Sequence, residues 1–144
     1  MTEIFFYHGA RDRLQAAANW LFNSWEQRQP VLVYAPNDDV GNQLDRILWT
    51  QAPTGFVPHC RAASPLASET PIVITNDFFA LPSLPQDERL LNLADEVPPG
   101  FARFQTLIEI VSNEDSVRIP ARERFKFYRE RGYQLQSKDL GSTV

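Results

Sequence analysis

Short apolar runs alternate with longer amphipathic segments along this chain, and that alternation is the feature that most constrains its fold. An apolar run of a few residues predicts a buried strand, whereas apolar residues that recur every three or four positions predict a helix. Strands and helices that alternate in this way favour a single three-layer α/β domain with a mostly parallel sheet. The predicted strands lie at residues 4–7, 31–34, 72–74, 90–93 and 107–111, and the first two helices at 11–28 and 40–48.

A third helix is predicted near the C-terminal end, from Pro120 to Arg131. Pro120 suits the first turn of a helix, where its missing N–H is not needed, and Gly132 suits the left-handed residue that follows a helix. A start nearer Asp115 is the alternative, with Pro120 still in the first turns. The proline-rich segments between the strands are interpreted as loops, and residues 141–144 as a frayed tail.

The 144 residues fit one domain, 1–144, and their net charge of −4 argues against a protein that coats nucleic acid over its whole surface. The single cysteine, Cys60, has no partner for an internal disulfide, which is typical of a reducing compartment. The sequence shows neither a signal peptide nor a run of the roughly 18 apolar residues that a membrane span needs. We therefore expect a cytoplasmic protein with no membrane contact.

The loops after the first two predicted strands carry too few glycines for a nucleotide site. The segment His8-Gly9-Ala10-Arg11 has one glycine and Ala35-Pro36-Asn37 has none. Phosphate-binding and dinucleotide-binding loops use several glycines, because the backbone must approach the phosphates closely. The sequence therefore favours an α/β domain without a nucleotide-binding loop.

The titratable residues are not arranged as a catalytic or metal site. His59 and Cys60 are adjacent on an extended segment, so their side chains point to opposite faces and do not form a catalytic pair. With His8 as the other histidine, the chain has too few ligands of this kind for a zinc site. Asp38 and Asp39 are interpreted as helix-capping residues. We expect no catalytic residue, metal or cofactor.

The strongest local signal is a row of cations on the third helix. Projected at about 100° per residue, Arg122, Lys126 and Arg129 fall within an arc of about 60°, directly beside Phe125. Arg118 joins this row if the helix begins early enough. Such a face is either a solvated surface or a site for an anionic partner that also carries an apolar group, because arginine holds carboxylates in a bidentate manner.

A second signal combines Trp49 with the segment Phe56-Val57-Pro58-His59. Trp49 lies about 100° away from the apolar side of the helix over 40–48, so its ring is not directed at the core. Either a second packing layer buries both parts, or they form an exposed aromatic surface of the kind that is enriched in protein–protein interfaces.

These segments together resemble the chi subunit of bacterial DNA polymerase III. The resemblance lies in Leu44-Asp45-Arg46-Ile47-Leu48-Trp49, in Phe56-Val57-Pro58-His59, and in Ala121-Arg122-Glu123-Arg124-Phe125-Lys126-Phe127-Tyr128-Arg129 with Gly132-Tyr133. The order of elements and the length also match, so the resemblance covers nearly the whole chain. It implies a Rossmann-like domain without nucleotide binding, and a non-catalytic accessory subunit of the clamp-loader complex.

The resemblance also implies two protein partners. The first is the acidic, phenylalanine-terminated C-terminal tail of single-stranded DNA-binding protein, which in this family docks at the last helix. The residues implied for that contact are Arg122, Phe125, Lys126 and Arg129. The second partner is the psi subunit, which joins chi to the clamp loader. The residues implied for psi are Trp49, Phe56, Val57 and Pro58.

Two other functions fit parts of the sequence. A small α/β enzyme that acts on a phosphorylated or acidic metabolite would use the same basic helix, but the absent glycine loop argues against it. Strong direct nucleic-acid binding through the cations is disfavoured by the net charge of −4. The segments 60–70 and 78–89 match the family pattern least well, and their roles are left open.

Overall fold

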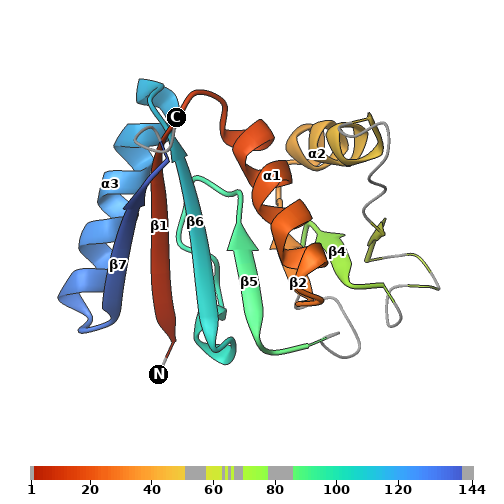
Figure 1. The fold of residues 1–144 in the computed structure, drawn as a ribbon. Helices are drawn as coiled ribbons and strands as arrows, with labels where there is room; N and C mark the ends of the chain where they lie inside the picture. Colours follow the sequence, from red (N-terminus) through yellow and green to blue (C-terminus); the bar gives the residue numbers. More distant parts are fainter. Residues whose placement is uncertain are drawn as a thin grey trace.

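The computed structural model in Figure 1 describes residues 2–50, 58–62, 64, 66, 70–77 and 86–140. The described residues form a single α/β domain with seven strands, three α-helices and a short 3₁₀-helix. The strands are β1 (Glu3–Ala10), β2 (Val31–Tyr34), β3 (His59–Arg61), β4 (Ile72–Thr75), β5 (Arg89–Asn92), β6 (Thr106–Ser112) and β7 (Gln134–Asp139). The helices are α1 (Arg13–Glu26), α2 (Asp38–Thr50), α3 (Asp115–Glu130) and the 3₁₀-helix η3 (Phe101–Arg103).

The seven strands run parallel in the order β3-β4-β2-β5-β6-β1-β7, which confirms the predicted parallel sheet. The first strand, β1, lies between β6 and β7, so strands from the two ends of the chain are neighbours. All seven strands end at the same edge of the sheet because they are parallel. Loops and helix starts gather at this edge.

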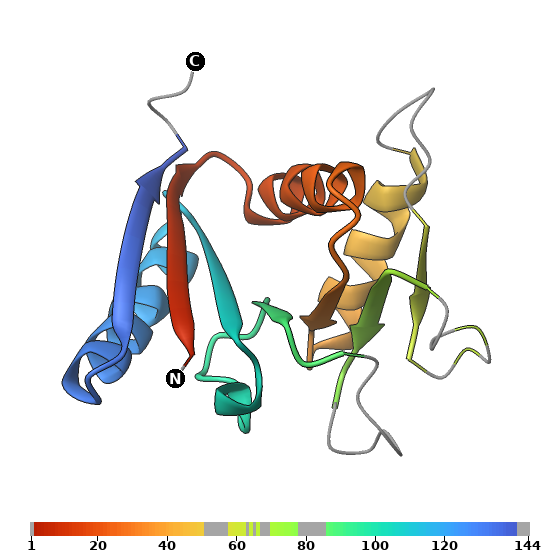
Figure 2. The same ribbon diagram turned by 60° about the horizontal axis from the view of Figure 1, so that its bottom comes forward.

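The helices cover both faces of the sheet, which gives three layers. In Figures 1 and 2, α1 and α2 lie on one face and α3 on the other. Successive side chains of a strand point to opposite faces. On β2, Val31 and Val33 accordingly pack with α1 and α2, while Leu32 packs in the cluster that includes Tyr128 of α3. The third helix is therefore held on a face of its own.

The predicted strands and helices are all present, but two strands were not predicted. β3 has three residues, and β7 is a polar edge strand whose side chains are mostly exposed, so neither shows the apolar pattern used for the prediction. The predicted end of the first strand at residue 7 was also wrong. β1 continues to Ala10 because Gly9 adopts a φ of 80°, where the register with β6 shifts.

The third helix begins at Asp115, so the predicted start at Pro120 was wrong and the alternative start is the one observed. Pro120 is its sixth residue, and Arg118 lies within the helix. Gly132 has the expected positive φ, 83°, and its N–H donates to the carbonyl of Arg129 at 3.1 Å. Among the described residues, none of the helices is both long and apolar enough to cross a membrane.

Candidate functional site: the cationic side of the third helix

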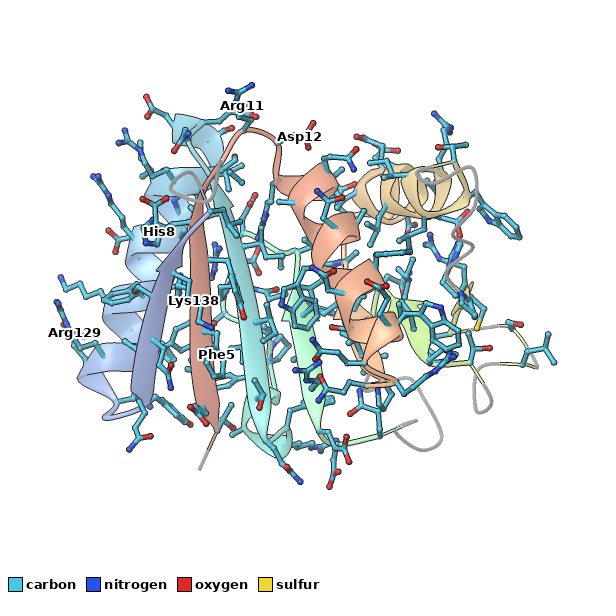
Figure 3. All side chains as sticks on the ribbon, viewed as in Figure 1. Phe5, His8, Arg11, Asp12, Arg129 and Lys138 are labelled. Atoms are coloured by element: carbon cyan, nitrogen blue, oxygen red, sulfur yellow. The ribbon has the colours of Figure 1, made fainter. Side chains whose placement is uncertain are left out.

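Four exposed cations lie along one side of α3, and we call them the cationic strip: Arg118, Arg122, Lys126 and Arg129. Phe125 borders this strip and is half-buried. Its ring meets that of Phe6 on β1 edge-on, with 5.1 Å between centroids. The guanidinium of Arg129 lies 5.9 Å from the centroid of Phe125, and Figure 3 shows Arg129 pointing away from the sheet. The structure therefore brings together Arg122, Phe125, Lys126 and Arg129, the residues implied by the resemblance.

Arg118 completes the strip at the beginning of α3. Its Nη2 donates to Asp115 Oδ1 at 2.5 Å, and both side chains are well exposed. This pair is worth little to stability, because water and salt screen exposed charges. A carboxylate of a binding partner could therefore replace Asp115 as the partner of Arg118 at little cost in stability.

A hollow of about 430 Å³ lies at the N-terminal end of α3, beside the ends of β1, β6 and β7. Ser112 is 1% exposed, and within the described part of the chain its hydroxyl has no hydrogen-bond partner. The N–H groups in the first turn of α3 give this end of the helix a partial positive charge. The residues that line the hollow are His8, Gly9, Val111, Ser112, Asn113, Arg118 and Asp139.

The inward side of α3 carries a buried ion pair that the sequence analysis did not identify. Glu109 lies in the middle of β6 with no exposed surface. Arg124 of α3 is 3% exposed and holds this carboxylate with two groups, Nε to Oε2 at 3.0 Å and Nη2 to Oε1 at 3.2 Å. A glutamate within an apolar strand was the signal that a buried partner exists. The helical projection also places Arg124 on the side of α3 that faces away from the strip.

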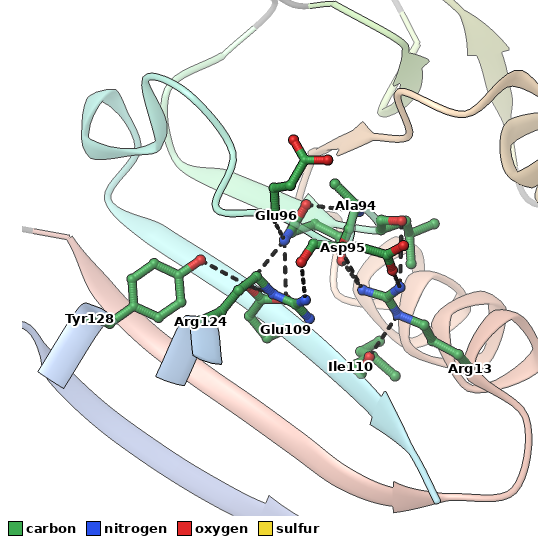
Figure 4. A network of polar contacts seen from close by, with 10 residues as sticks. Arg13, Ala94, Asp95, Glu96, Glu109, Ile110, Arg124 and Tyr128 are labelled. Atoms are coloured by element: carbon green, nitrogen blue, oxygen red, sulfur yellow. Dashed lines mark hydrogen bonds and ion pairs between the residues drawn. The ribbon is translucent and has the colours of Figure 1, made fainter. Parts of the chain in front are cut away.

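Two further side chains donate hydrogen bonds to Glu109, and Figure 4 labels one of them, Tyr128. The hydroxyl of Tyr128 donates to Oε2 at 2.8 Å, and the amide of Asn92 donates to both carboxylate oxygens at 3.2 and 3.0 Å. Burial, followed by the charge of Glu109, raises the pKa of Tyr128 well above its ordinary value. Tyr128 therefore stays a neutral donor at any physiological pH.

A second buried arginine closes the crevice where many α/β domains bind a nucleotide. Arg13, at the start of α1, donates to the carbonyls of Ile110, Ala94 and Asn92 at 2.9, 3.2 and 3.3 Å. Burial lowers the pKa of Arg13, and the negative charge of Glu109 opposes that effect. The guanidinium thus uses its donors on backbone oxygens at the ends of β5 and β6.

The rim of this crevice is acidic. A cleft of about 550 Å³ lies at the ends of the strands next to Arg13. Its exposed carboxylates repel phosphate, and the preceding loops lack the glycines that would bring backbone N–H groups to a phosphate. The acidic residues that line it are Asp12, Asp95, Glu96 and Glu114.

The other predicted contact surface lies on α2. Trp49 is 59% exposed, which confirms that its ring points away from the core. The ring of His59 meets that of Trp49 at 5.2 Å, and His59 Nε2 lies 3.1 Å from Asp45 Oδ1. Pro58 is half-buried directly before β3. Two residues of the predicted psi contact, Phe56 and Val57, lie outside the described residues.

The structure agrees with the interpretation of His59 and Cys60 but not with that of the two aspartates. Cys60 packs in the cluster on the α3 face, whereas His59 contacts α2, so the two point to opposite faces as predicted. Asp38 and Asp39 lie in the first turn of α2, and their interpretation as caps was wrong, because the side chain of Asn37 accepts from the N–H of Asp39 at 2.9 Å. In the described ranges, no three His, Cys, Asp or Glu side chains are grouped so as to hold a metal ion.

The fold and this surface define a class of small parallel α/β domain that presents a cationic helix to its surroundings and fills its nucleotide crevice with an arginine. Comparison with known proteins identifies the family within that class. The family model described as DNA polymerase III chi subunit, HolC, matches residues 1–136. The chain belongs to the DNA polymerase III chi subunit family.

Individual relatives agree with this assignment. A chi subunit of DNA polymerase III from Pseudomonas aeruginosa is 32% identical over an alignment of 146 residues, which covers 97% of this chain and 98% of the relative. Chi subunits from Haemophilus influenzae and Escherichia coli are each 28% identical, and their alignments cover 88% and 78% of this chain and 87% and 76% of the relatives. The resemblance seen in the sequence is confirmed, and the protein is a non-catalytic accessory subunit of the polymerase III holoenzyme.

Because Arg124 forms the buried ion pair and Arg122 does not, replacing each by methionine should lower the free energy of unfolding by different amounts. We expect Arg124→Met to lower the free energy of unfolding by about 3–5 kcal/mol, because Glu109 then keeps a buried charge without its countercharge. We expect Arg122→Met, at an exposed position of the same helix, to change it by less than about 0.5 kcal/mol. Urea unfolding followed by circular dichroism measures both, and equal losses would contradict the stabilising role of the pair.

Proposed function

We propose that the cationic strip binds the acidic, phenylalanine-terminated C-terminal tail of single-stranded DNA-binding protein, and that the protein thereby links the polymerase to coated single-stranded DNA. The observation that carries this proposal is the strip itself, four exposed cations on one side of one helix in a protein with a net charge of −4. A local positive surface on an acidic body attracts an acidic partner and orients it. The proposal places the protein in the cytoplasm, where DNA replication takes place in bacteria.

The hollow next to Arg118 supports a particular orientation of the tail. A C-terminal phenylalanine carries a ring and a free carboxylate on the same residue. The hollow offers the apolar side chain of Val111 together with the N-terminal end of α3, the buried hydroxyl of Ser112 and the cation of Arg118. These groups suit a carboxylate next to a ring, and the three donors stand against one repelling carboxylate in the lining, that of Asp139. The acidic residues that precede the phenylalanine would then follow the strip toward Arg129.

The exposed Trp49 supports a second contact, with the psi subunit. Its ring presents a large apolar surface, and the ring of the neighbouring His59 packs against it edge-on. Exposed tryptophans of this kind are frequent hot spots of interfaces. The α2 surface lies on the opposite face of the sheet from α3, so psi and the tail can bind at the same time. Weak tail contacts then gain strength from multivalency, because single-stranded DNA-binding protein coats the strand in many copies.

The tail proposal is tested by fluorescence anisotropy of a labelled acidic peptide that ends in Asp-Ile-Pro-Phe. We expect saturable binding in the micromolar range that disappears when the final phenylalanine is removed. The double variant Arg122→Ala/Lys126→Ala is expected to weaken binding about tenfold or more, and added salt to weaken it further. The control Arg28→Ala/Arg46→Ala makes the same change in net charge away from α3 and should bind as the parent does. Equal affinity of both double variants would refute the site.

The pair between Arg118 and Asp115 predicts a variant that binds the tail more tightly. Asp115→Asn removes a negative charge beside the incoming peptide and releases Arg118, so we expect the Kd to fall about two- to threefold at low salt. The matched control is Asp39→Asn, which removes an acidic residue from the first turn of α2 instead. If both variants shift the Kd equally, the effect is one of net charge and the local explanation is wrong.

The psi proposal is tested by calorimetric titration of the psi subunit encoded in the same genome. We expect Trp49→Ala to weaken psi binding about tenfold or more while leaving the affinity for the tail peptide unchanged. The Arg122→Ala/Lys126→Ala variant should show the reverse pattern. A Trp49→Ala variant that binds psi like the parent would remove Trp49 from the contact.

A further inference from the structure

The direction in which the cationic strip faces depends on the rotation of α3 about its own axis. A helix with its side chains has a radius of about 5–6 Å, so a rotation of about 30° moves the outer groups by about 3 Å. That displacement equals a whole hydrogen-bond distance. Cations that must meet successive carboxylates of one peptide therefore need a helix whose rotation is fixed.

The apolar contacts of α3 constrain that rotation only in part. Tyr128 meets the rings of Phe6 and Phe101, and Phe125 meets Phe6 edge-on, whereas the small Ala121 makes little contact of its own. Aromatic pairs prefer certain geometries, but each is worth only about 0.5–1.5 kcal/mol. Hydrogen bonds to a charged group are stronger and more directional, so a polar residue on the same side of the helix would select the rotation more sharply.

Arg124 has the position that such a selecting residue requires. It lies about 200° around the helix from both Arg122 and Lys126, almost diametrically opposite the cationic strip. Its three nitrogens each make a separate contact to a different acceptor atom: Nε and Nη2 to the two oxygens of Glu109, and Nη1 to the carbonyl of Asp95 at 2.8 Å. Hydrogen bonds to a planar fork are directional, so they are lost together when the helix turns.

The acceptors are themselves fixed. Glu109 is central in β6 and is also held by Asn92 of β5, and the carbonyl of Asp95 belongs to the segment after β5 whose carbonyls bind Arg13. The anchor of α3 thus connects to two strands and to the first helix, as Figure 4 shows. A rotation of α3 would have to break contacts to a rigid part of the sheet.

We propose that Glu109 and Arg124 are positioning residues for tail recognition: the buried pair fixes the rotation of α3 and so places the cationic strip. The inference rests on the proposed function, since it concerns the same strip. Neither residue touches the tail. Their effect on affinity is exerted through the orientation of Arg122, Lys126 and their neighbours.

The experiment uses a full-length variant that replaces the polar anchor with apolar groups, Glu109→Leu/Arg124→Met/Tyr128→Phe. Apolar groups of similar volume often replace a buried ion pair without loss of stability. The net charge stays at −4 because one acid and one base are removed together. We expect a melting temperature close to that of the parent, with tail affinity reduced about three- to tenfold and a shallower dependence of the Kd on salt, since fewer cations reach the peptide.

A second measurement reports the orientation of α3 without any peptide. In a Cys60→Ser background, nitroxide labels at the exposed positions Glu123 of α3 and Asn19 of α1 give a distance distribution by double electron–electron resonance. We expect this distribution to broaden or shift in the apolar variant. Ile74→Val, a mild core change on the other face of the sheet, is the control for reduced stability and should alter neither the distribution nor the tail affinity.

The outcomes separate this inference from the proposed function. An apolar variant that keeps both the parent's tail affinity and its distance distribution overturns the positioning role. If the parent itself fails to bind the peptide, the proposed function is wrong, and the distance distribution still decides whether the pair fixes α3. Should the apolar variant fail to fold, Arg124→Lys, which keeps the charge but not the fork, provides both readouts: weaker binding with a broader distribution supports the role, and parental values overturn it.

Discussion

The carboxylate of Glu109 is the group on which the arrangement of this protein depends most. A charge with no exposed surface in the centre of a sheet is tolerated only when it is paired and its remaining lone pairs are satisfied. Here donors from two elements satisfy the carboxylate of β6: α3 contributes Arg124 and Tyr128, and β5 contributes Asn92. The polar core thus determines how the outer helix meets the sheet, a task that the apolar contacts share but do not complete.

Two arginines from opposite helical layers meet at the segment that follows β5. Arg13 reaches it from α1 and Arg124 from α3, and both donate to its backbone carbonyls. In related α/β folds this edge receives a ligand at the N-terminus of a helix. In the chi subunit a guanidinium of the protein itself lies at this edge, and carboxylates line the cleft beside it, so the edge offers little to a phosphate. The proposed contacts with partners lie on the outer surfaces of the helices instead.

The sequence was sufficient for the features that rest on local pattern. The apolar runs at Val31 and Ile72 and the spacing of Arg122, Lys126 and Arg129 each report on neighbouring residues, and the structure agrees with them. Features built from distant residues were missed. The hollow joins His8, Ser112 and Asp139, which no single window of sequence contains. The buried pair joins β6 to α3, and the window around β6 shows only the glutamate, not its partner. β7 was missed because an edge strand exposed to water has no need of apolar alternation.

The parallel pairing of β1 with β7 determines when, during synthesis, the sheet of this protein can be completed. Glu3 is in register with Gln134 and His8 with Asp139, so the two ends of the sequence share one ladder. Contacts between such remote residues close late in folding. During synthesis on the ribosome, one edge of β1 stays unpaired until nearly the whole polypeptide has emerged. The hollow beside α3, which needs both His8 and Asp139, is completed only then. A truncated or stalled nascent chain that lacks β7 therefore carries the third helix but not the completed hollow beside it.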